Sequence, residues 1–367
     1  MGRARDIASL LTTSSVLATD AEIASFGYLT NSSASSIYTP LSSPVTSYKN
    51  KIINGSMRFW QRGTTFTNPG GAYTADRYMV TQNATSGTYV ASRQTASLEG
   101  FQYCMRLQRS ASQTATGGIF LGHSLESADV IPLQSKPMVF SFYARKGSNF
   151  SSVSSDINVQ LATGTGTDGQ AFAGLTNEVT QISTTAVLTT SWQRFSYTFT
   201  APSNASQLRF NINYTPNGTA STNDYFDITG IQLELGSMLT DFEHKSISTE
   251  LQMCQRYYQA IEVPIESLVG QYSSPGGGTF YSQAVYFPTT MRTTPSSVTY
   301  TNLGAGNYWV IVGNTAVSAA SLTGQTFTAN TDSLKIQHVR QSGGGTPTVG
   351  NTYIWEAGFR LGVNAEL

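Results

Sequence analysis

Residues 207–214 read QLRFNINY, and their order of side chains is informative about the fold class. Every second residue is a large hydrophobic one: Leu208, Phe210, Ile212 and Tyr214. The residues between them are polar: Arg209, Asn211 and Asn213. Successive side chains of a β-strand point to opposite faces, so this pattern predicts a strand with one buried face and one face in water. Strands of that kind are typical of antiparallel sheets, in which one face packs on the core and the other faces water.

The same alternation appears in two other stretches. In QRFSYTFTAP, residues 193–202, aromatic residues occupy every second position: Phe195, Tyr197 and Phe199. The stretch PMVFSFYARKG, residues 137–147, has a similar pattern. Turns rich in Gly, Ser and Asn separate these short strands, and no helical pattern lies between them, which favours a β-sandwich. We therefore predict a first antiparallel β-sandwich over residues 49–243.

The alternation changes phase in DYFDITGIQLELG, residues 224–236. Phe226 and Ile228 share one face, and the next hydrophobic residues follow one position out of step: Ile231, Leu233 and Leu235. One extra residue in a strand, a β-bulge, restores the original face. The sequence therefore predicts a bulge at Thr229–Gly230 that keeps all five residues in the core.

Residues 264–367 have a similar texture, and we predict a second antiparallel β-sandwich there. Val310 and Val312 alternate with Trp309 and Ile311, and Leu334 and Ile336 begin a similar strand. Glycine-rich turns would lie at loop tips, where binding residues are common. An aromatic ring suits the C–H face of a sugar, so the rings near these tips are the candidate receptor-binding residues: Tyr272, Tyr281 and Trp309.

Between the two sandwiches, we predict a short linker helix over residues 244–263. A narrow hydrophobic stripe at i, i+4, i+7 and i+11 predicts a face that packs against the linker's neighbours: Ile247, Leu251, Cys254 and Tyr258. A catalytic cysteine needs a base within hydrogen-bond reach. The nearest histidine in the sequence, His244, lies about three helical turns before Cys254. Cys254 is therefore predicted to be a buried structural residue.

The first 48 residues are small and polar, with two short helical stripes. The hydrophobic residues that we expect to dock this segment on a partner are few: Ile7, Leu11, Ile23 and Phe26. So few hydrophobic residues do not form a core alone. We therefore predict an extended or short-helical N-terminal segment that is ordered by sister chains or by a docking partner.

Composition excludes several kinds of partner and gives no support to an enzyme. The 21 Lys+Arg and 21 Asp+Glu residues give a net charge of zero, so no basic surface for nucleic acid is indicated. No hydrophobic run approaches the roughly 18 residues of a membrane span. The three histidines are scattered without metal-ligand spacing. No metal site and no cofactor are predicted, although Asp224 or Asp227 would supply oxygen ligands for a structural Ca²⁺ ion.

Several segments of the chain resemble structural proteins of bacteriophage virions, and two of them carry most of the resemblance. The first resembles a pattern N-x-x-x-N-G-x-F/M-x-x-WQRG followed by Y-x-A-D-R-W/Y, and the matching residues are Asn50, Asn54, Gly55, Trp60, Gln61, Arg62, Gly63, Tyr73, Ala75, Asp76, Arg77 and Tyr78. The second resembles the motifs I/V-Q-L-E-x-G, T-x-F-E-x-[KR]-S and L-x-x-C-Q-R-Y-Y, with matches at residues 231–236, 240–246 and 251–258. The ending Asn364-Ala365-Glu366-Leu367 is similar to the A-x-A-E-L ending of that group. Residues 19–41 resemble a fibre repeat, without its Asp-Gly turn.

The resemblance implies a jelly-roll domain similar to carbohydrate-binding modules, trimeric assembly and a place on the virion. We expect a tail fibre or other appendage subunit, assembled in the host cytoplasm. Residues 1–48 would trimerise and dock on a tail adaptor, nozzle or baseplate protein. The linker stripe would pack in a homotrimer, and the second sandwich would recognise a bacterial surface glycan.

Two alternatives remain open. A head fibre or capsid decoration protein would use the same modules on the capsid surface. A polysaccharide depolymerase would need two carboxylates across a cleft, for which Glu126 with Asp129 and Asp224 with Asp227 are the candidate pairs. Because 21 acidic residues offer many such pairs, we expect a protein that is not an enzyme.

Overall fold

The structure is a computed structural model. It describes residues 48–83, 87–263, 269–271, 279–281, 285–302, 310–312, 315–317, 326–339, 352–354 and 359–367. The predicted N-terminal docking residues, from Ile7 to Phe26, lie outside these ranges, so their role stays a prediction.

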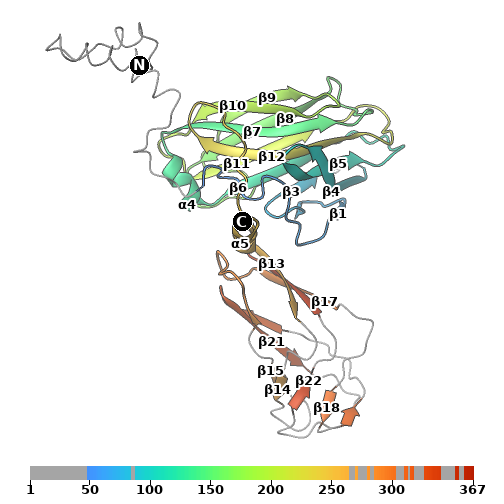
Figure 1. The fold of residues 1–367 in the computed structure, drawn as a ribbon, viewed down its shortest axis with the longest axis vertical. Helices are drawn as coiled ribbons and strands as arrows, with labels where there is room; N and C mark the ends of the chain where they lie inside the picture. The colour runs from blue at the N-terminus through green and yellow to red at the C-terminus, as the bar shows by residue number, and fades with distance from the viewer. Residues whose placement is uncertain are drawn as a thin grey trace, which may run out of the picture.

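Two six-stranded antiparallel sheets pack face to face in the first part of the chain (Figure 1). One sheet, the β12 sheet, has the order β1 (Thr65–Thr67), β4 (Tyr89–Leu98), β5 (Phe101–Arg109), β12 (Tyr225–Leu235), β7 (Pro137–Lys146) and β10 (Gln193–Thr200). The other, the β11 sheet, has the order β2 (Ala72–Tyr73), β3 (Met79–Gln82), β6 (Ile119–Leu125), β11 (Gln207–Tyr214), β8 (Asp156–Gly164) and β9 (Val179–Val187). The predicted mainly-β class is therefore confirmed.

The alternation in β11 sets the position of the core. Its hydrophobic residues, from Leu208 to Tyr214, are at most 1% exposed, and they face the inner side of the β12 sheet. The aromatic residues of β10 are partly buried against the same core: Phe195, Tyr197 and Phe199. This agrees with the position of β10 at the edge of its sheet.

The predicted bulge in β12 is confirmed. The register between β12 and β7 shifts between Thr229 and Gln232, and Gly230 there has a φ of 62°. Phe226, Ile228, Ile231 and Leu233 are all 0% exposed, so the bulge returns the later hydrophobic residues to the core. Leu235, the last of the five predicted residues, is partly buried against the same core.

The helices in the described ranges are short: α4 (Ser127–Val130), the 3₁₀ turn η1 (Ile131–Leu133) and α5 (Ile247–Gln255). No helix among the described residues is long and apolar enough to cross a membrane. Ser246 caps α5, and its hydroxyl accepts a hydrogen bond from the backbone N–H of Thr249 at 3.3 Å.

The linker helix is shorter than predicted, because the chain enters a strand soon after Gln255. Tyr258–Val263 forms β13, which pairs along its whole length with β23 (Phe359–Asn364) near the end of the chain. Tyr258 is therefore a strand residue, and the helical stripe ends at Cys254. Pairing with a strand about 100 residues away decides this boundary, and a local pattern does not reveal such a partner.

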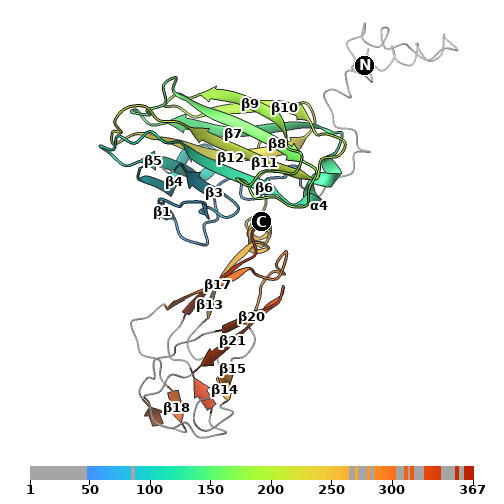
Figure 2. The same cartoon turned by 180° about the vertical axis from the view of Figure 1, so that it is seen from behind.

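The remaining strands form smaller antiparallel sheets that extend from the sandwich beyond α5 (Figures 1 and 2). β23 lies between β13 and β17 (Ser297–Asn302). β21 (Ser333–Val339) pairs with β15 (Thr279–Tyr281), β16 (Val285–Tyr286) and β20 (Thr326–Ala329). Two further pairs join β14 (Val269–Gln271) to β22 (Thr352–Ile354) and β18 (Val310–Val312) to β19 (Thr315–Val317). A second cluster of buried residues lies here: Met291, Leu334, Leu361, Val363 and Ala365.

Candidate functional site

Among the described residues, those of the motifs in residues 50–78 and 231–258 lie around one place, the junction between the sandwich, α5 and the end of the chain. The Asn50 side chain donates to the carbonyl of Ile231 at 3.0 Å and accepts from the N–H of Leu233 at 3.1 Å. The N–H of Asn54 donates to the carboxylate of Glu250 in α5 at 3.0 Å. These two asparagines therefore tie the first motif to β12 and to the helix.

The second half of the junction is a buried cluster of charges. The Asp76 carboxylate accepts hydrogen bonds from the backbone N–H and the side-chain amide of Gln61, at 3.0 and 2.7 Å. Arg77 forms an ion pair with Glu366, and its guanidinium lies 3.5 Å from the centre of the Tyr257 ring. Burial raises the pKa of Asp76 to about 6, with Arg62 acting in the opposite direction.

Arg62 connects the same cluster to the last strands. It contacts Glu366 at 3.2 Å, and its guanidinium lies 3.6 Å from the centre of the Tyr258 ring. The residues of the WQRG and ADR motifs thus hold the C-terminal residues against the sandwich. Packing and internal pairing account for the contacts that these residues make.

Cys254 belongs to this packed region. It is 0% exposed, and burial and the nearby Asp76 charge raise the pKa of its thiol well above the usual value. A thiol in such surroundings stays protonated and unreactive. The other residues of the predicted stripe differ: Leu251 is half-buried, and Ile247 at the start of α5 is 59% exposed. Their packing in a trimer stays a prediction.

Three of the four carboxylates considered for cleavage are engaged in ion pairs, and the fourth, Asp129, is exposed and forms no ion pair among the described residues. Asp227 forms ion pairs with Arg106 and Arg145, and Asp224 forms one with Arg109. Both aspartate side chains are 0% exposed. Glu126 accepts from both ends of the Arg256 guanidinium fork, at 3.2 and 2.9 Å. In the part of the chain that the structure describes, no group of three or more His, Cys, Asp or Glu residues is arranged to hold a metal ion.

The outer face of the β11 sheet carries an uncharged chain of side-chain amides, which we name the amide platform. It consists of Asn158, Gln160, Asn211 and Asn213. Asn158 donates to Asn213 at 3.1 Å, Asn213 donates to Asn211 at 3.0 Å, and Asn211 donates to Gln160 at 3.3 Å. Asn158 and Gln160 are exposed, whereas Asn211 is half-buried and Asn213 is 8% exposed, so the two amides of β8 are the ones that face water.

The strand register arranges these amides in two rows. In one row Phe120 of β6, Asn213, Asn158 and Thr185 of β9 are neighbours across four strands. The other row has Gly122, Asn211, Gln160 and Ser183 in the same order. With strands about 4.8 Å apart, each row spans roughly 14 Å.

An aromatic ring is held at the β6 end of the second row. A side-chain Cβ at Gly122 would lie 2.7 Å from the Phe172 ring, so glycine there lets this ring rest directly on β6. Phe172 also packs edge-on against Phe120, with ring centroids 6.4 Å apart. Arg209 fixes the loop by donating to the carbonyl of Ala171 at 2.8 Å and pairing with Glu178.

These groups have the chemistry that recognises hydroxyl-rich, uncharged molecules. Each carboxamide offers two donors and one acceptor oxygen, and Ser183 and Thr185 add hydroxyls. Half-buried rings at one edge, Phe120 and Phe172, supply an apolar surface. Sites for small molecules combine an apolar wall with a few placed polar groups in this way.

The predicted receptor-binding residues are not part of this platform. Tyr272 and Trp309 lie outside the described residues, and Tyr281 is the last residue of β15. Their binding role stays a prediction. The sequence did place Asn211 and Asn213 on a wet face. The partners across the strands, Asn158 and Gln160, have the same polar spacing of two, which is a signal in the sequence that our predictions did not use.

No protein-family model matches the chain, and no curated protein matches it. Among solved structures, it is similar to the enzymatically active domain of tailspike protein 4 from bacteriophage CBA120, at 13% identity and a TM-score of 0.34. That match covers 52% of this chain and 22% of the tailspike chain. A putative sugar-binding protein from Bacteroides thetaiotaomicron matches at 11% identity and a TM-score of 0.32, covering 51% of this chain and 100% of that one. The xylan-binding domain of CBM 22 matches at 13% identity and a TM-score of 0.29, covering 49% and 99%.

Proposed function

We propose that the protein is a structural subunit of a phage tail fibre or similar virion appendage, and that its first sandwich binds glycans on the amide platform. The observation that carries the binding proposal is the hydrogen-bonded chain of carboxamides, exposed at Asn158 and Gln160, with Phe172 held at its edge. The protein binds without cleaving, because each candidate pair of carboxylates has at least one member that is already paired with an arginine: Glu126 in one pair, Asp224 and Asp227 in the other.

The place on a virion is supported by the resemblance of residues 50–78 and 228–258 to phage structural proteins. The junction gives those motifs a physical role that suits an appendage. Arg62 and Arg77 couple the sandwich to the last strands, so a force on one part is transmitted to the other. We place the protein on the outside of the particle, as a homotrimer docked through residues 1–48 and assembled in the host cytoplasm.

The experiment for glycan binding uses a panel of neutral oligosaccharides and the purified full chain. The double variant Asn158→Ala/Gln160→Ala removes two exposed amides and should weaken binding at least tenfold with little change in Tm. The matched control is Ser196→Ala/Thr198→Ala, which changes two exposed residues on β10 of the other sheet. Equal losses in both variants, or no binding by the wild type, would overturn the platform.

The virion location has its own experiment. Antibody against the C-terminal strands, with gold detection on intact particles, should label the tail. Label spread over the capsid would instead indicate a head fibre or decoration protein.

A further inference from the structure

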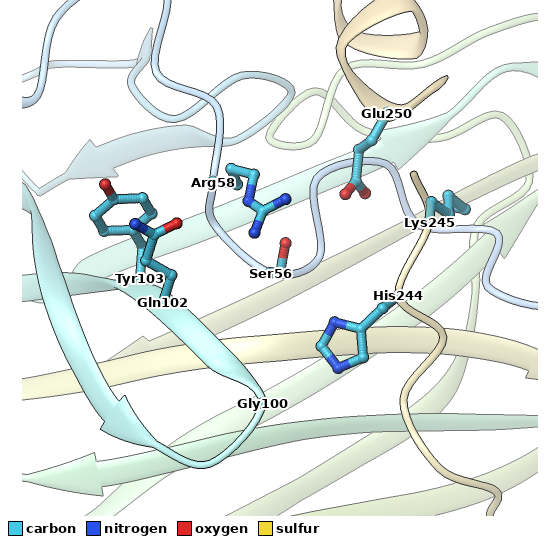
Figure 3. Close-up of a pocket in the computed structure, with 8 residues that line it drawn as sticks. All are labelled: Ser56, Arg58, Gly100, Gln102, Tyr103, His244, Lys245 and Glu250. Carbon is cyan, nitrogen blue, oxygen red and sulfur yellow. The ribbon is translucent and has the colours of Figure 1, made fainter. Parts of the chain in front are cut away.

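A small polar pocket lies away from the amide platform, beside the turn of the β4–β5 hairpin (Figure 3). Its walls come from the loop before β1, from that hairpin, and from the segment that leads into α5. Its volume is about 80 Å³, which is room for several water molecules. It is therefore large enough for one functional group of a ligand and too small to enclose a large one.

Arg58 is the unpaired cation of this pocket. It forms neither a hydrogen bond nor an ion pair within the described part of the chain. Figure 3 shows its guanidinium directed toward the same space as the hydroxyl of Ser56 and the carboxylate of Glu250. A guanidinium offers a planar fork of donors that fits a carboxylate with two parallel hydrogen bonds.

Glu250 is the acceptor on the opposite wall. It is 7% exposed, and one of its oxygens accepts from the N–H of Asn54 at 3.0 Å. Its other oxygen has no partner among the described residues. Lys245 does not neutralise it by contact, because the ammonium donates to the carbonyls of Asn50 and Ile52 at 2.8 and 3.0 Å.

His244 lies at the rim of the pocket and is held by aromatic neighbours. Its ring lies 5.3 Å from that of Phe101 and 4.9 Å from that of Phe242, measured between centroids. Burial, and then the Arg58 charge, lower the pKa of this imidazole from 6.5. At neutral pH it is uncharged, so one ring nitrogen donates and the other accepts.

Arg58 and Glu250 do not pair with each other, so a ligand that bridges them must bring an anionic acceptor to one and a hydrogen-bond donor to the other. Among the residues that line the pocket, two are cations, Arg58 and Lys245, and one is a carboxylate, Glu250, which favours a net anion over a zwitterion. Resting on the proposed function for its ligand class, we propose that this pocket binds a hexuronate residue of an acidic glycan. The sugar carboxylate lies on Arg58, and an adjacent hydroxyl donates to Glu250.

The experiment compares two probes that differ in one group, methyl glucuronide and methyl glucoside. Titration calorimetry or ligand-observed NMR with the full chain should give at least tenfold tighter binding of the glucuronide. The variant Arg58→Gln keeps an amide donor but removes the charge, and should abolish that preference. Arg58→Lys should restore only part of it, because an ammonium lacks the fork. The control Lys136→Gln removes one exposed charge elsewhere and should leave the preference intact.

Each other outcome has a clear meaning. Equal binding of both probes, or a preference that survives in Arg58→Gln, overturns the inference. Binding of inorganic phosphate or of alanine as tightly as the glucuronide also overturns it, since the site would then hold small anions or zwitterions in general. Glucuronide binding that persists in Asn158→Ala/Gln160→Ala supports the pocket as a separate site. The platform variant tests neutral glycan binding, and Arg58→Gln tests glucuronide binding. Each proposal can therefore fail while the other holds.

Discussion

Arg77 and Glu366 lie 289 positions apart in the chain, and their side chains form an ion pair in which they are 1% and 3% exposed. Arg77 also donates to the carbonyl of Ser124 at 2.7 Å, so one guanidinium joins the sandwich core to the end of the chain. Removing one partner of a buried pair leaves a charge without compensation. The pair therefore makes the stability of the last strands depend on the sandwich.

Glu366→Gln tests this dependence, because it keeps the shape of the side chain and removes its charge. We expect a loss of about 3–5 kcal/mol in the free energy of unfolding at the junction, the usual cost of breaking a buried ion pair. Calorimetry should show a lower Tm, and limited proteolysis should cut faster near β13. Glu262→Gln is the matched control, since Glu262 is exposed on β13 and forms no ion pair among the described residues. Equal Tm values for the two variants would contradict the role of Glu366.

Asp76 makes the junction sensitive to pH. Burial raises its pKa to about 6 from 3.8, so the folded chain favours the protonated form. The stabilisation from this group is complete below pH 3.8 and is lost as the pH rises through 6. Its size is on the order of 3 kcal/mol, since one pKa unit corresponds to about 1.4 kcal/mol.

Asp76→Asn isolates that effect, because all other carboxylates are shared with the wild type. We expect the difference in Tm, variant minus wild type, to increase as the pH rises from 4 to 7. A constant difference across this range would show that Asp76 titrates at its ordinary pKa. An NMR titration of the Asp76 carboxyl carbon gives the same answer directly.

The core of the sandwich was predictable because its signal is local. In β11 a period of two places Leu208 and Phe210 inside, and in β12 the phase slip at Gly230 marks the bulge. Because one face of each strand is buried, hydrophobic residues recur at every second position. Residues close together in the sequence therefore show which side of the strand faces the core.

The end of α5 and the amide platform depend instead on contacts between distant segments. The hydrophobic stripe continues to Tyr258, but pairing with β23 and the Arg62 guanidinium over its ring place that residue in a strand. Asn211 and Gln160 become neighbours only through the order of β11 and β8 in the sheet. Strand order is not encoded in any single stretch, so these features required the structure.

Gly55 is predicted to be intolerant of any side chain. A Cβ there would lie 2.1 Å from the backbone carbonyl oxygen of Ile231, and backbone atoms do not move aside cheaply. Overpacking in a core costs typically 1–3 kcal/mol, and we expect Gly55→Ala to reach or exceed the upper end. Gly174→Ala is the control, since nothing lies within 4 Å of its added Cβ. Chemical denaturation should separate the two variants clearly, and similar midpoints would contradict the close approach of Gly55 to β12.

Gly122→Ala connects packing to binding. The added methyl would meet the Phe172 ring at 2.7 Å and the Ala171 side chain at 2.8 Å, so the ring must leave β6. Because Arg209 and Glu178 hold this loop from the side, we expect displacement of the ring with a Tm loss of a few degrees. Binding of neutral oligosaccharides should fall by the same factor as in Phe172→Ala, and the double variant should be no worse than either. If Gly122→Ala binds like the wild type while Phe172→Ala does not, the Phe172 ring contributes to sugar binding without its contact with β6 at Gly122. Independent, additive losses would mean that Gly122 and Phe172 act on the platform by separate routes.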